Sequence, residues 1–261
     1  MGLTSTGSLQ LQAGQVDVWL ASLSNVSSSE AFAYLQLLSE PEQAQWQRFK
    51  VEDARLQYLV TRALVRTTLS RYADVPARTW QFETNAYGCP HISQPQALRN
   101  LRFNLSNTTG LVACAVSMDC EIGIDVENIT RTVDADAVAP SVFAPAELAD
   151  FREAGLEDQR ERFFSYWTLK ESYIKARGMG LSLPLDAFWF ELGGTSPLLC
   201  VTDRCPDIPD RWRFYQHAPT DEHMMAVAVA APQGVEPSIH PRWVKPMSLI
   251  AEFGMTSRFS R

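Results

Sequence analysis

The sequence predicts a mixed α+β protein with mainly antiparallel sheets. Short alternating or apolar segments typical of strands recur along the 261 residues, and longer segments with helical periodicity interrupt them. Helices and strands do not follow each other in the βαβα order of a doubly wound parallel sheet. A change of composition near Met118 divides the chain into two parts of similar length, and both contain helices and strands. We therefore expect two α+β halves.

The first half is predicted to begin with a strand and to contain a long helix, the second of two helical stretches. Val16–Leu20 alternates like a half-buried strand, and Asp53–Tyr72 carries apolar residues at helical spacing. Thr79–Glu83 predicts another strand, Asn85–Pro90 a turn, and Leu111–Ser117 an apolar strand. Both kinds of element therefore occur before residue 118.

The second half repeats this mixture. Glu121–Glu127 alternates strictly, Ala146–Ala154 predicts a short helix behind Pro145, and Asp158–Arg177 predicts a long helix that ends at Gly178. Four further segments have the composition of strands: Leu185–Leu192, Leu198–Thr202, Arg211–Gln216 and Met224–Ala230. This half is therefore also α+β.

We place the halves at residues 1–118 and 119–235. Residues 236–261 form a tail of mixed Pro, Arg and Met content to which we assign no place in the fold. The net charge of −7 is unevenly shared, since residues 1–118 carry +1 and the rest of the chain −8. This balance argues against a general binder of nucleic acid or of anionic membranes. An anionic ligand would need local cations or a bound metal.

The composition favours a cytoplasmic protein. The longest apolar stretches, Leu111–Val116 and Met224–Ala231, are far shorter than the roughly 18–20 residues that span a bilayer. No basic segment precedes an apolar one at the start, as it would in a secretory signal. The five cysteines form no C-x-x-C pair, so we expect reduced thiols and neither a disulfide framework nor a zinc site.

Two acidic side chains share one face of the strand predicted at Glu121–Glu127. The two-residue period of a strand places Asp125 and Glu127 together, opposite an apolar face. Neighbouring like charges repel each other, which is useful where a hard divalent cation lies between them. The alternative for this segment alone is a solvated strand end with an apolar underside.

A second candidate group lies on the long helix predicted at Asp158–Arg177. Glu171 and Lys175 are one helical turn apart, at the margin of an apolar stripe. Lys170 points about 100° away from Glu171 and is expected to reach another part of the same ligand. The alternative is an ordinary ion pair of Glu171 with Lys175, worth about 0.2–0.5 kcal/mol.

Taken together, these segments resemble the Sfp-type 4′-phosphopantetheinyl transferases of the holo-acyl carrier protein synthase superfamily. The motifs that carry the resemblance appear in the family's order: Tyr87-Gly88-Cys89-Pro90, Phe103-Asn104-Leu105-Ser106, Gly123-Ile124-Asp125-Val126-Glu127, Trp167-Thr168-Leu169-Lys170-Glu171-Ser172-Tyr173-Ile174-Lys175-Ala176 and Gly178-Met179-Gly180-Leu181. The resemblance covers about residues 15–192. The last predicted strands and the tail are supported only by the general layout.

The resemblance implies a monomer of two similar α+β halves, related by a pseudo-twofold axis, with the active site in the cleft between them. Asp125, Glu127 and Glu171 match the family's Mg²⁺ ligands, with Mn²⁺ as an alternative ion. Three carboxylates, two from a strand and one from a helix, suit a small cation that binds oxygen. The implied co-substrate is coenzyme A, and the implied partner is an apo acyl, polyketide or peptidyl carrier protein.

Further residues match the family's coenzyme A contacts. Lys170 and Lys175 match its phosphate-contacting lysines, and Ser106 and Asn107 stand at its cofactor-binding motif. Basic residues early in the family's first half meet the 3′-phosphate of coenzyme A.

Arg48, Lys50 and Arg55 lie in the corresponding part of this chain. We take Arg55 as the candidate among them, while a solvated helix face is the alternative for each.

The implied reaction is attack by the hydroxyl of a carrier-protein serine on the β-phosphorus of coenzyme A, which releases adenosine 3′,5′-bisphosphate. Positioning and charge neutralisation dominate transfers of this kind. We expect Glu171 to act as the base and Lys175 to stabilise or protonate the leaving phosphate.

Two positions depart from the family's pattern. Asn107 stands where a histidine is usual, and Cys89 stands where a basic residue is common. An amide can donate a hydrogen bond to phosphate but cannot act as a base. We therefore expect weaker binding of coenzyme A unless other groups replace these two.

Two other functions remain open at this point. One is a non-catalytic relative that binds carrier proteins or coenzyme A without transfer, which Asn107 and Cys89 keep open. The other is a different Mg²⁺-dependent phosphotransferase or a nuclease built on the same carboxylates, although the acidic chain argues against nucleic acid.

Overall fold

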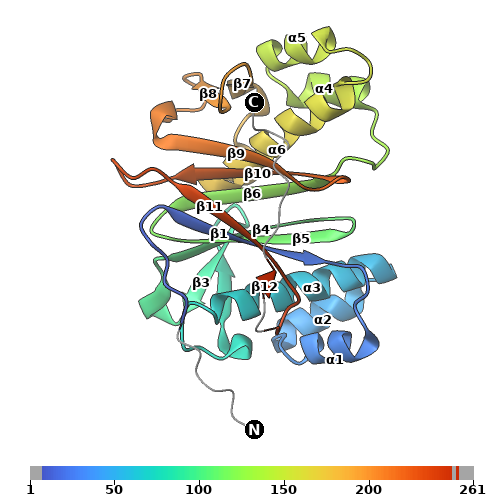
Figure 1. Cartoon of the computed structure of the whole chain (residues 1–261), viewed down its shortest axis with the longest axis vertical. Helices are drawn as coiled ribbons and strands as arrows, with labels where there is room; N and C mark the ends of the chain where they lie inside the picture. Colours follow the sequence, from blue (N-terminus) through green and yellow to red (C-terminus); the bar gives the residue numbers. More distant parts are fainter. Residues whose placement is uncertain (1–7, 249–250, 253–261) are drawn as a thin grey trace.

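The computed structural model describes residues 8–248 and 251–252 and arranges them in four layers (Figure 1). Two sheets lie face to face at the centre, and helices cover their outer faces. The five-stranded sheet has the order β12-β11-β1-β5-β4, and the three-stranded sheet has the order β6-β10-β9. The predicted α+β fold class is confirmed.

The first half contributes helices α1 (Ser28–Leu35), α2 (Glu40–Arg48) and α3 (Glu52–Leu69), and strands β1 (Gln15–Ser22), β2 (Gln81–Thr84), β3 (Pro90–Gln94), β4 (Leu101–Thr108) and β5 (Leu111–Met118). The second half contributes helices α4 (Ala135–Val142), α5 (Pro145–Glu153) and α6 (Gln159–Arg177), and strands β6 (Glu121–Asn128), β7 (Phe188–Glu191), β8 (Leu198–Val201), β9 (Trp212–Thr220) and β10 (His223–Ala230). Strands β11 (Ser238–Val244) and β12 (Ala251–Glu252) follow. Strands β2 and β3 pair as a hairpin, as do β7 and β8.

Three apolar clusters hold the layers together. One lies between α3 and the five-stranded sheet, and another lies between α6 and the three-stranded sheet. The third joins the two sheets, and its buried side chains include Val18, Ala113, Ile124 and Val227. Alternation along β6 therefore turns Ile124 into the core between the sheets and leaves Asp125 on the face toward α6.

Most elements expected from the sequence are present within one to three residues of their predicted ends. The structure adds strands β3 and β4, helix α4, and a long-range pairing in the tail. Strand β11 pairs parallel with β1, from Gln15 opposite Ser238 to Leu20 opposite Trp243. The tail, unplaced by the sequence, therefore adds a strand to the first half's sheet, while residues 253–261 lie outside the described part of the chain.

Helix α6 packs very closely on β6 at Gly123. A Cβ atom at Gly123 would lie 1.9 Å from the carbonyl oxygen of Ser172 and 2.4 Å from the nitrogen of Ala176. Only glycine fits this contact without movement of the backbone. The helix ends at Gly178, which has the left-handed φ of 61° that the sequence predicts. This close approach brings Glu171 and Lys175 over β6.

Polar side chains on β4 join the two halves along β6. Asn104 accepts a hydrogen bond from the backbone N–H of Ile124 at 3.0 Å, and Ser106 accepts one from Val126 at 3.1 Å. Thr108 accepts one from the backbone N–H of Asn128 at 3.1 Å. The side chains of β4 thereby satisfy the backbone donors of β6, which is an edge strand of its own sheet.

Among the described residues, no helix is both long enough and apolar enough to cross a membrane. All five cysteines are unpaired.

Candidate active site

The candidate site lies where α6 crosses the carboxyl half of β6. Strand β6 supplies Asp125 and Glu127, and α6 supplies Glu171 and Lys175. Strand β4 of the other half borders the same place with Ser106. The site is therefore assembled from both halves of the fold.

Asp125 and Lys175 form an ion pair at the centre of a small hydrogen-bond network. The Lys175 ammonium donates to Asp125 Oδ1 at 2.7 Å, to Ser106 Oγ at 2.9 Å and to the carbonyl of Ile124 at 3.2 Å. Ser106 also donates to Asp125 Oδ1 at 2.9 Å. Asp125 is 5% exposed, and its second oxygen, Oδ2, is buried without a hydrogen-bond partner. That oxygen is an acceptor still available to a ligand.

Glu127 accepts hydrogen bonds from three residues of different segments, the most distant being Thr108 at 3.5 Å. The indole Nε1 of Trp167 donates to Glu127 Oε1 at 2.9 Å, and Arg131 Nε donates to Oε2 at 3.2 Å. Burial raises the pKa of Glu127, and the negative charge of Asp125 raises it further, while Arg131 and Trp167 act in the opposite direction. The ionised form of Glu127 is thus less favourable than in water.

Glu171 experiences the same effects. Burial raises its pKa, as do the charges of Asp125 and then Glu127, while Lys175 lowers it. Glu171 and Lys175 line a cavity of about 260 Å³, together with the turn at Tyr87 and Cys89. A carboxylate of raised pKa beside an ammonium is thus accessible to a bound molecule.

The three carboxylates suit a divalent cation in their chemistry. They are oxygen donors of hard character, the charge of Asp125 raises the pKa of both Glu127 and Glu171, and Asp125 Oδ2 lacks a partner. They are not gathered into a metal cluster in the part of the chain that the structure describes. Asp125 and Glu127 are instead paired with Lys175 and Arg131. The donor set therefore fits Mg²⁺. Lys175 and Arg131 would have to share these carboxylates with the ion or move away from them.

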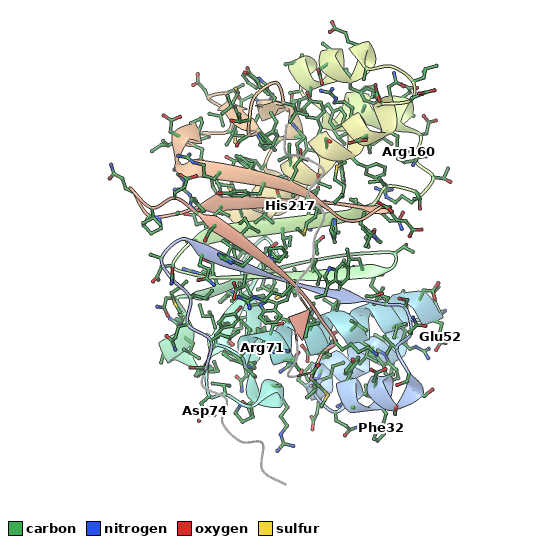
Figure 2. The ribbon with its side chains drawn as sticks, in the orientation of Figure 1. Phe32, Glu52, Arg71, Asp74, Arg160 and His217 are labelled. Carbon is green, nitrogen blue, oxygen red and sulfur yellow. The ribbon has the colours of Figure 1, made fainter. Side chains whose placement is uncertain are left out.

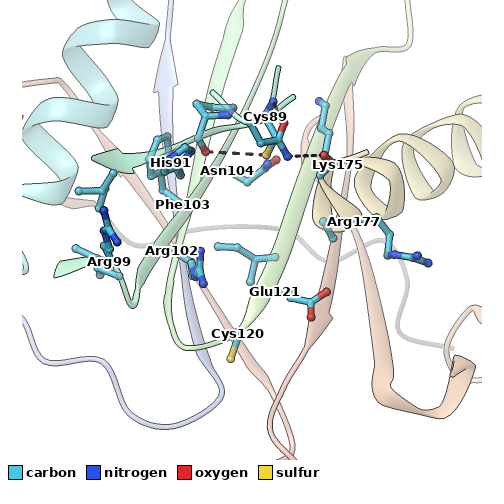
Figure 3. A pocket seen from close by; sticks show the side chains of 17 residues that line it. Cys89, His91, Arg99, Arg102, Phe103, Asn104, Cys120, Glu121, Lys175 and Arg177 are labelled. Atoms are coloured by element: carbon cyan, nitrogen blue, oxygen red, sulfur yellow. Dashed lines mark hydrogen bonds between the residues drawn. The ribbon is translucent and has the colours of Figure 1, made fainter. Parts of the chain in front are cut away.

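A second cavity, of about 300 Å³, adjoins the first and shares Cys89 and Lys175 with it (Figure 3). Its lining includes Arg99 just before β4, Arg102 on β4 and Arg177 at the end of α6. Glu121 also lines it. The cleft is thus cationic on this side, in contrast with the net charge of −7 of the whole chain.

Comparisons with known proteins agree with this arrangement. The 4′-phosphopantetheinyl transferase superfamily model matches residues 121–228, and the model of the N-terminal part of 4′-phosphopantetheinyl transferase matches residues 25–119. The 4′-phosphopantetheinyl transferase HetI of Nostoc sp. is 31% identical over 85% of this chain and 90% of its own length. The chain belongs to the 4′-phosphopantetheinyl transferase family.

Other relatives support this assignment. The 4′-phosphopantetheinyl transferase Sfp of Bacillus subtilis is 31% identical over 62% of this chain and 70% of its own length. A phosphopantetheinyl transferase of Thraustochytrium sp. is 25% identical over 74% of this chain and 70% of its own length. The reaction of the chain is that of its family, transfer of the 4′-phosphopantetheine arm of coenzyme A to an apo carrier protein.

One residue expected at the phosphotransferase site lies elsewhere. Lys170 is 0% exposed, and its ammonium donates to Glu147 at 2.6 Å and to the carbonyl of Phe188 at 2.8 Å. The expectation that Lys170 contacts phosphate is therefore wrong. Its side chain leaves the helix on the side of α5 and β7, where it neutralises the buried Glu147.

The other residues predicted to contact coenzyme A lie in different places. Ser106 lies within the site, as described above. Asn107 is exposed at the end of β4 and accepts a hydrogen bond from Gln57 at 2.6 Å. Arg55 donates to the carbonyl of Phe49 at 2.8 Å and lies over the ring of Trp46, and it lines neither of the two cavities described here. The structure thus brings Ser106 to Asp125, whereas Arg55 contacts residues of its own segment.

Sequence reasoning did not identify Trp167, Arg131 or Asn104 as parts of this site. Trp167 lies one helical turn before Glu171, a spacing that could have placed its indole beside the carboxylates. Arg131 lies four residues after Glu127 in a segment with no periodic pattern. Asn104 belongs to the quoted Phe103–Ser106 motif, but its hydrogen bond to β6 depends on tertiary structure.

Proposed function

We propose that Asp125, Glu127 and Glu171 bind one Mg²⁺ ion in the cleft, and that Lys175 and Glu171 carry out the transfer of phosphopantetheine. The observation that carries the proposal is the position of the Lys175 ammonium. Asp125, Ser106 and the carbonyl of Ile124 hold it at the wall of the cavity that also contains Glu171. A fixed cation and a carboxylate of raised pKa thus face one space.

The cation fits the charge balance of the reaction. The diphosphate of coenzyme A is strongly anionic, and the second part of this chain is acidic. When bound, Mg²⁺ would supply the positive charge that neutralises the diphosphate and the phosphate that leaves. Mn²⁺ has the same preference for oxygen ligands and would serve as its substitute in experiments.

The side chains then have distinct tasks. Glu171 accepts the proton from the hydroxyl of the carrier serine as the bond between its oxygen and the β-phosphorus forms. The bond between the β-phosphorus and the bridging oxygen breaks, and adenosine 3′,5′-bisphosphate leaves. Lys175 binds the leaving phosphate and either stabilises its negative charge or donates a proton to it. The raised pKa of Glu171 makes its carboxylate a stronger base than a solvated one.

We also propose that the enzyme is a monomer and acts in the cytoplasm on an apo acyl or peptidyl carrier protein, as the resemblance to the family implies. Light scattering coupled to size-exclusion chromatography tests the monomer.

Mass spectrometry of the carrier tests the proposed function. Wild-type protein with Mg²⁺ and coenzyme A should add the mass of the phosphopantetheine arm to an apo carrier, and Glu171→Gln should reduce the rate by at least ~100-fold. Glu153→Gln on the exposed surface of α5 is the matched control and should retain the wild-type rate. Unchanged transfer by Glu171→Gln would remove that residue from the mechanism. Binding of coenzyme A without any mass change would indicate a non-catalytic relative, and hydrolysis of nucleotides without a carrier would indicate another phosphotransferase.

A further inference from the structure

Both oxygens of Glu127 are engaged by the side chains of neighbouring residues. Arg131 Nε lies 3.2 Å from Oε2, and its Nη2 lies 3.4 Å from Oε1. The indole of Trp167 also donates to Oε1, at 2.9 Å. The Arg131 guanidinium thus lies where a cation bound to Glu127 would experience its charge directly.

The position of Arg131 does not depend on Glu127 alone. Its guanidinium lies over the ring of Phe164, 5.1 Å from the ring centroid. Arg160 at the start of α6, labelled in Figure 2, donates to the carbonyls of Ile129 and Arg131 at 2.7 and 2.9 Å. The backbone of this segment is thus fixed to α6. The side chain itself is 38% exposed, so its guanidinium has room to change partner.

The charges around the site are nearly balanced. Asp125, Glu127 and Glu171 carry three negative charges, and Lys175 and Arg131 carry two positive ones. A divalent cation alone would therefore meet a weak net attraction and would compete with Arg131 for Glu127. A diphosphate offers Arg131 an alternative anion of suitable geometry, because guanidinium binds phosphate oxygens in pairs. If Arg131 moves to the diphosphate, Glu127 loses its positively charged partner and keeps the neutral donors Trp167 and Thr108, at 2.9 and 3.5 Å. Each carboxylate oxygen then has a lone pair for the cation.

We propose that Arg131 is a positioning residue that exchanges Glu127 for the diphosphate of coenzyme A and thereby couples the binding of the divalent cation to that of coenzyme A. The inference rests on the proposed function of the three carboxylates. It predicts that the cation binds weakly to the protein alone and much more tightly once coenzyme A is present. By linkage, the cation strengthens the binding of coenzyme A by the same factor.

Titration of the full-length protein with Mn²⁺, followed by electron paramagnetic resonance and by calorimetry without carrier protein, tests this coupling. For wild type, saturating coenzyme A should lower the Kd of Mn²⁺ by at least ~10-fold, within the usual range of coupling. In Arg131→Gln, Mn²⁺ alone should bind ~3–10-fold more tightly, because one competing positive charge is gone, and the enhancement by coenzyme A should fall below ~3-fold. Arg131→Lys should give intermediate values, since it keeps the charge and loses the paired donors.

Arg152→Gln on the exposed side of α5 is the matched control. It should leave unchanged both the Kd of Mn²⁺ alone and the enhancement by coenzyme A. The same enhancement in Arg131→Gln as in wild type would overturn the inference and leave the metal site in place. Weaker binding of Mn²⁺ alone by Arg131→Gln would also overturn it, because Arg131 would then support the geometry of Glu127. If wild type and all variants fail to bind Mn²⁺ with coenzyme A present, the proposed metal function fails together with the inference.

Discussion

At the scale of single residues, the site brings the carboxylates of Asp125, Glu127 and Glu171 together where they are largely shielded from water. Glu127 and Glu171 both have a raised pKa, first because of burial and then because of Asp125. The local motif marks Glu171 as a candidate, but it does not show the raised pKa. That shift comes from burial and from Asp125 and Glu127, which lie 46 and 44 residues earlier in the chain. The sequence predicted that Asp125, Glu127, Glu171 and Lys175 belong to one site, but not that Arg131 and Trp167 contact Glu127.

At Mg²⁺ well below saturation, protons compete with the cation for Glu127 and Glu171. The rate of transfer should then decline in acid at a pH above the ordinary pKa of a glutamate side chain. The ionised carboxylates are the active forms, and their raised pKa values mean that protonation begins at higher pH than in water. Because Arg131 lowers the pKa of Glu127, Arg131→Gln should move this acidic limb to still higher pH. Initial rates measured from pH 5 to 8 test the shift, with Arg152→Gln as the unshifted control. An acidic limb at the same pH in wild type and Arg131→Gln would contradict it.

Glu171→Gln should make the protein more stable while it removes the activity. A folded-state pKa above the unfolded value means that the ionised side chain destabilises the fold at neutral pH, and this cost disappears as the pH falls through the raised pKa. Without a divalent cation, the variant should therefore unfold at a higher temperature than wild type at pH 7. Near pH 4 the difference should vanish. A lower unfolding midpoint at pH 7 would show that Glu171 stabilises the fold.

At the scale of elements, the contact of α6 with β6 determines the site. Both elements are recognisable locally, because one alternates strictly and the other has helical spacing and a glycine at its end. Strand β4 is less visible, since Asn104, Ser106 and Thr108 are polar yet buried against β6. The prediction that Lys170 contacts phosphate was wrong for a similar reason, because its partner Glu147 comes from α5. Tertiary partners decide such positions, and periodicity does not report them.

Gly123→Ala should separate α6 from β6. The added Cβ would lie 1.9 Å from the Ser172 carbonyl oxygen, so the backbone of one element must move. We expect a loss of about 3 kcal/mol or more in the free energy of unfolding, at the upper end for an overpacked core, and a strong loss of transfer. Gly193→Ala is the control, because no atom lies within 4 Å of its added Cβ. Urea denaturation measures both, and equal stability of the two variants would refute the close contact.

At the scale of the whole molecule, a strand from the last part of the chain joins the sheet of the first half. Strand β11 leaves the second half and pairs parallel with β1, and Arg242 lies 3.4 Å from Asp17. The sequence predicted the halves because each has its own elements. It left the tail unplaced, since the partner of β11 is more than 200 residues away.

Truncation after Val235 should destabilise the first half. It removes β11, exposes the edge of β1 and uncovers apolar side chains such as Trp19. The unfolding midpoint should fall by ~10 °C or more. A chain that ends at Glu252 keeps β11 and β12 and is the control. An unchanged midpoint after the first truncation would show that β11 adds little to stability.

The account as a whole depends on whether the three carboxylates share one cation beside the diphosphate of coenzyme A. A crystal structure of the wild-type protein with Mn²⁺ and coenzyme A tests this directly, through the anomalous signal of manganese. We predict one peak within bonding distance of Asp125, Glu127 and Glu171, with Lys175 in contact with the phosphates and Arg131 turned toward them. A peak bound elsewhere, with Glu127 still paired with Arg131, would contradict the account.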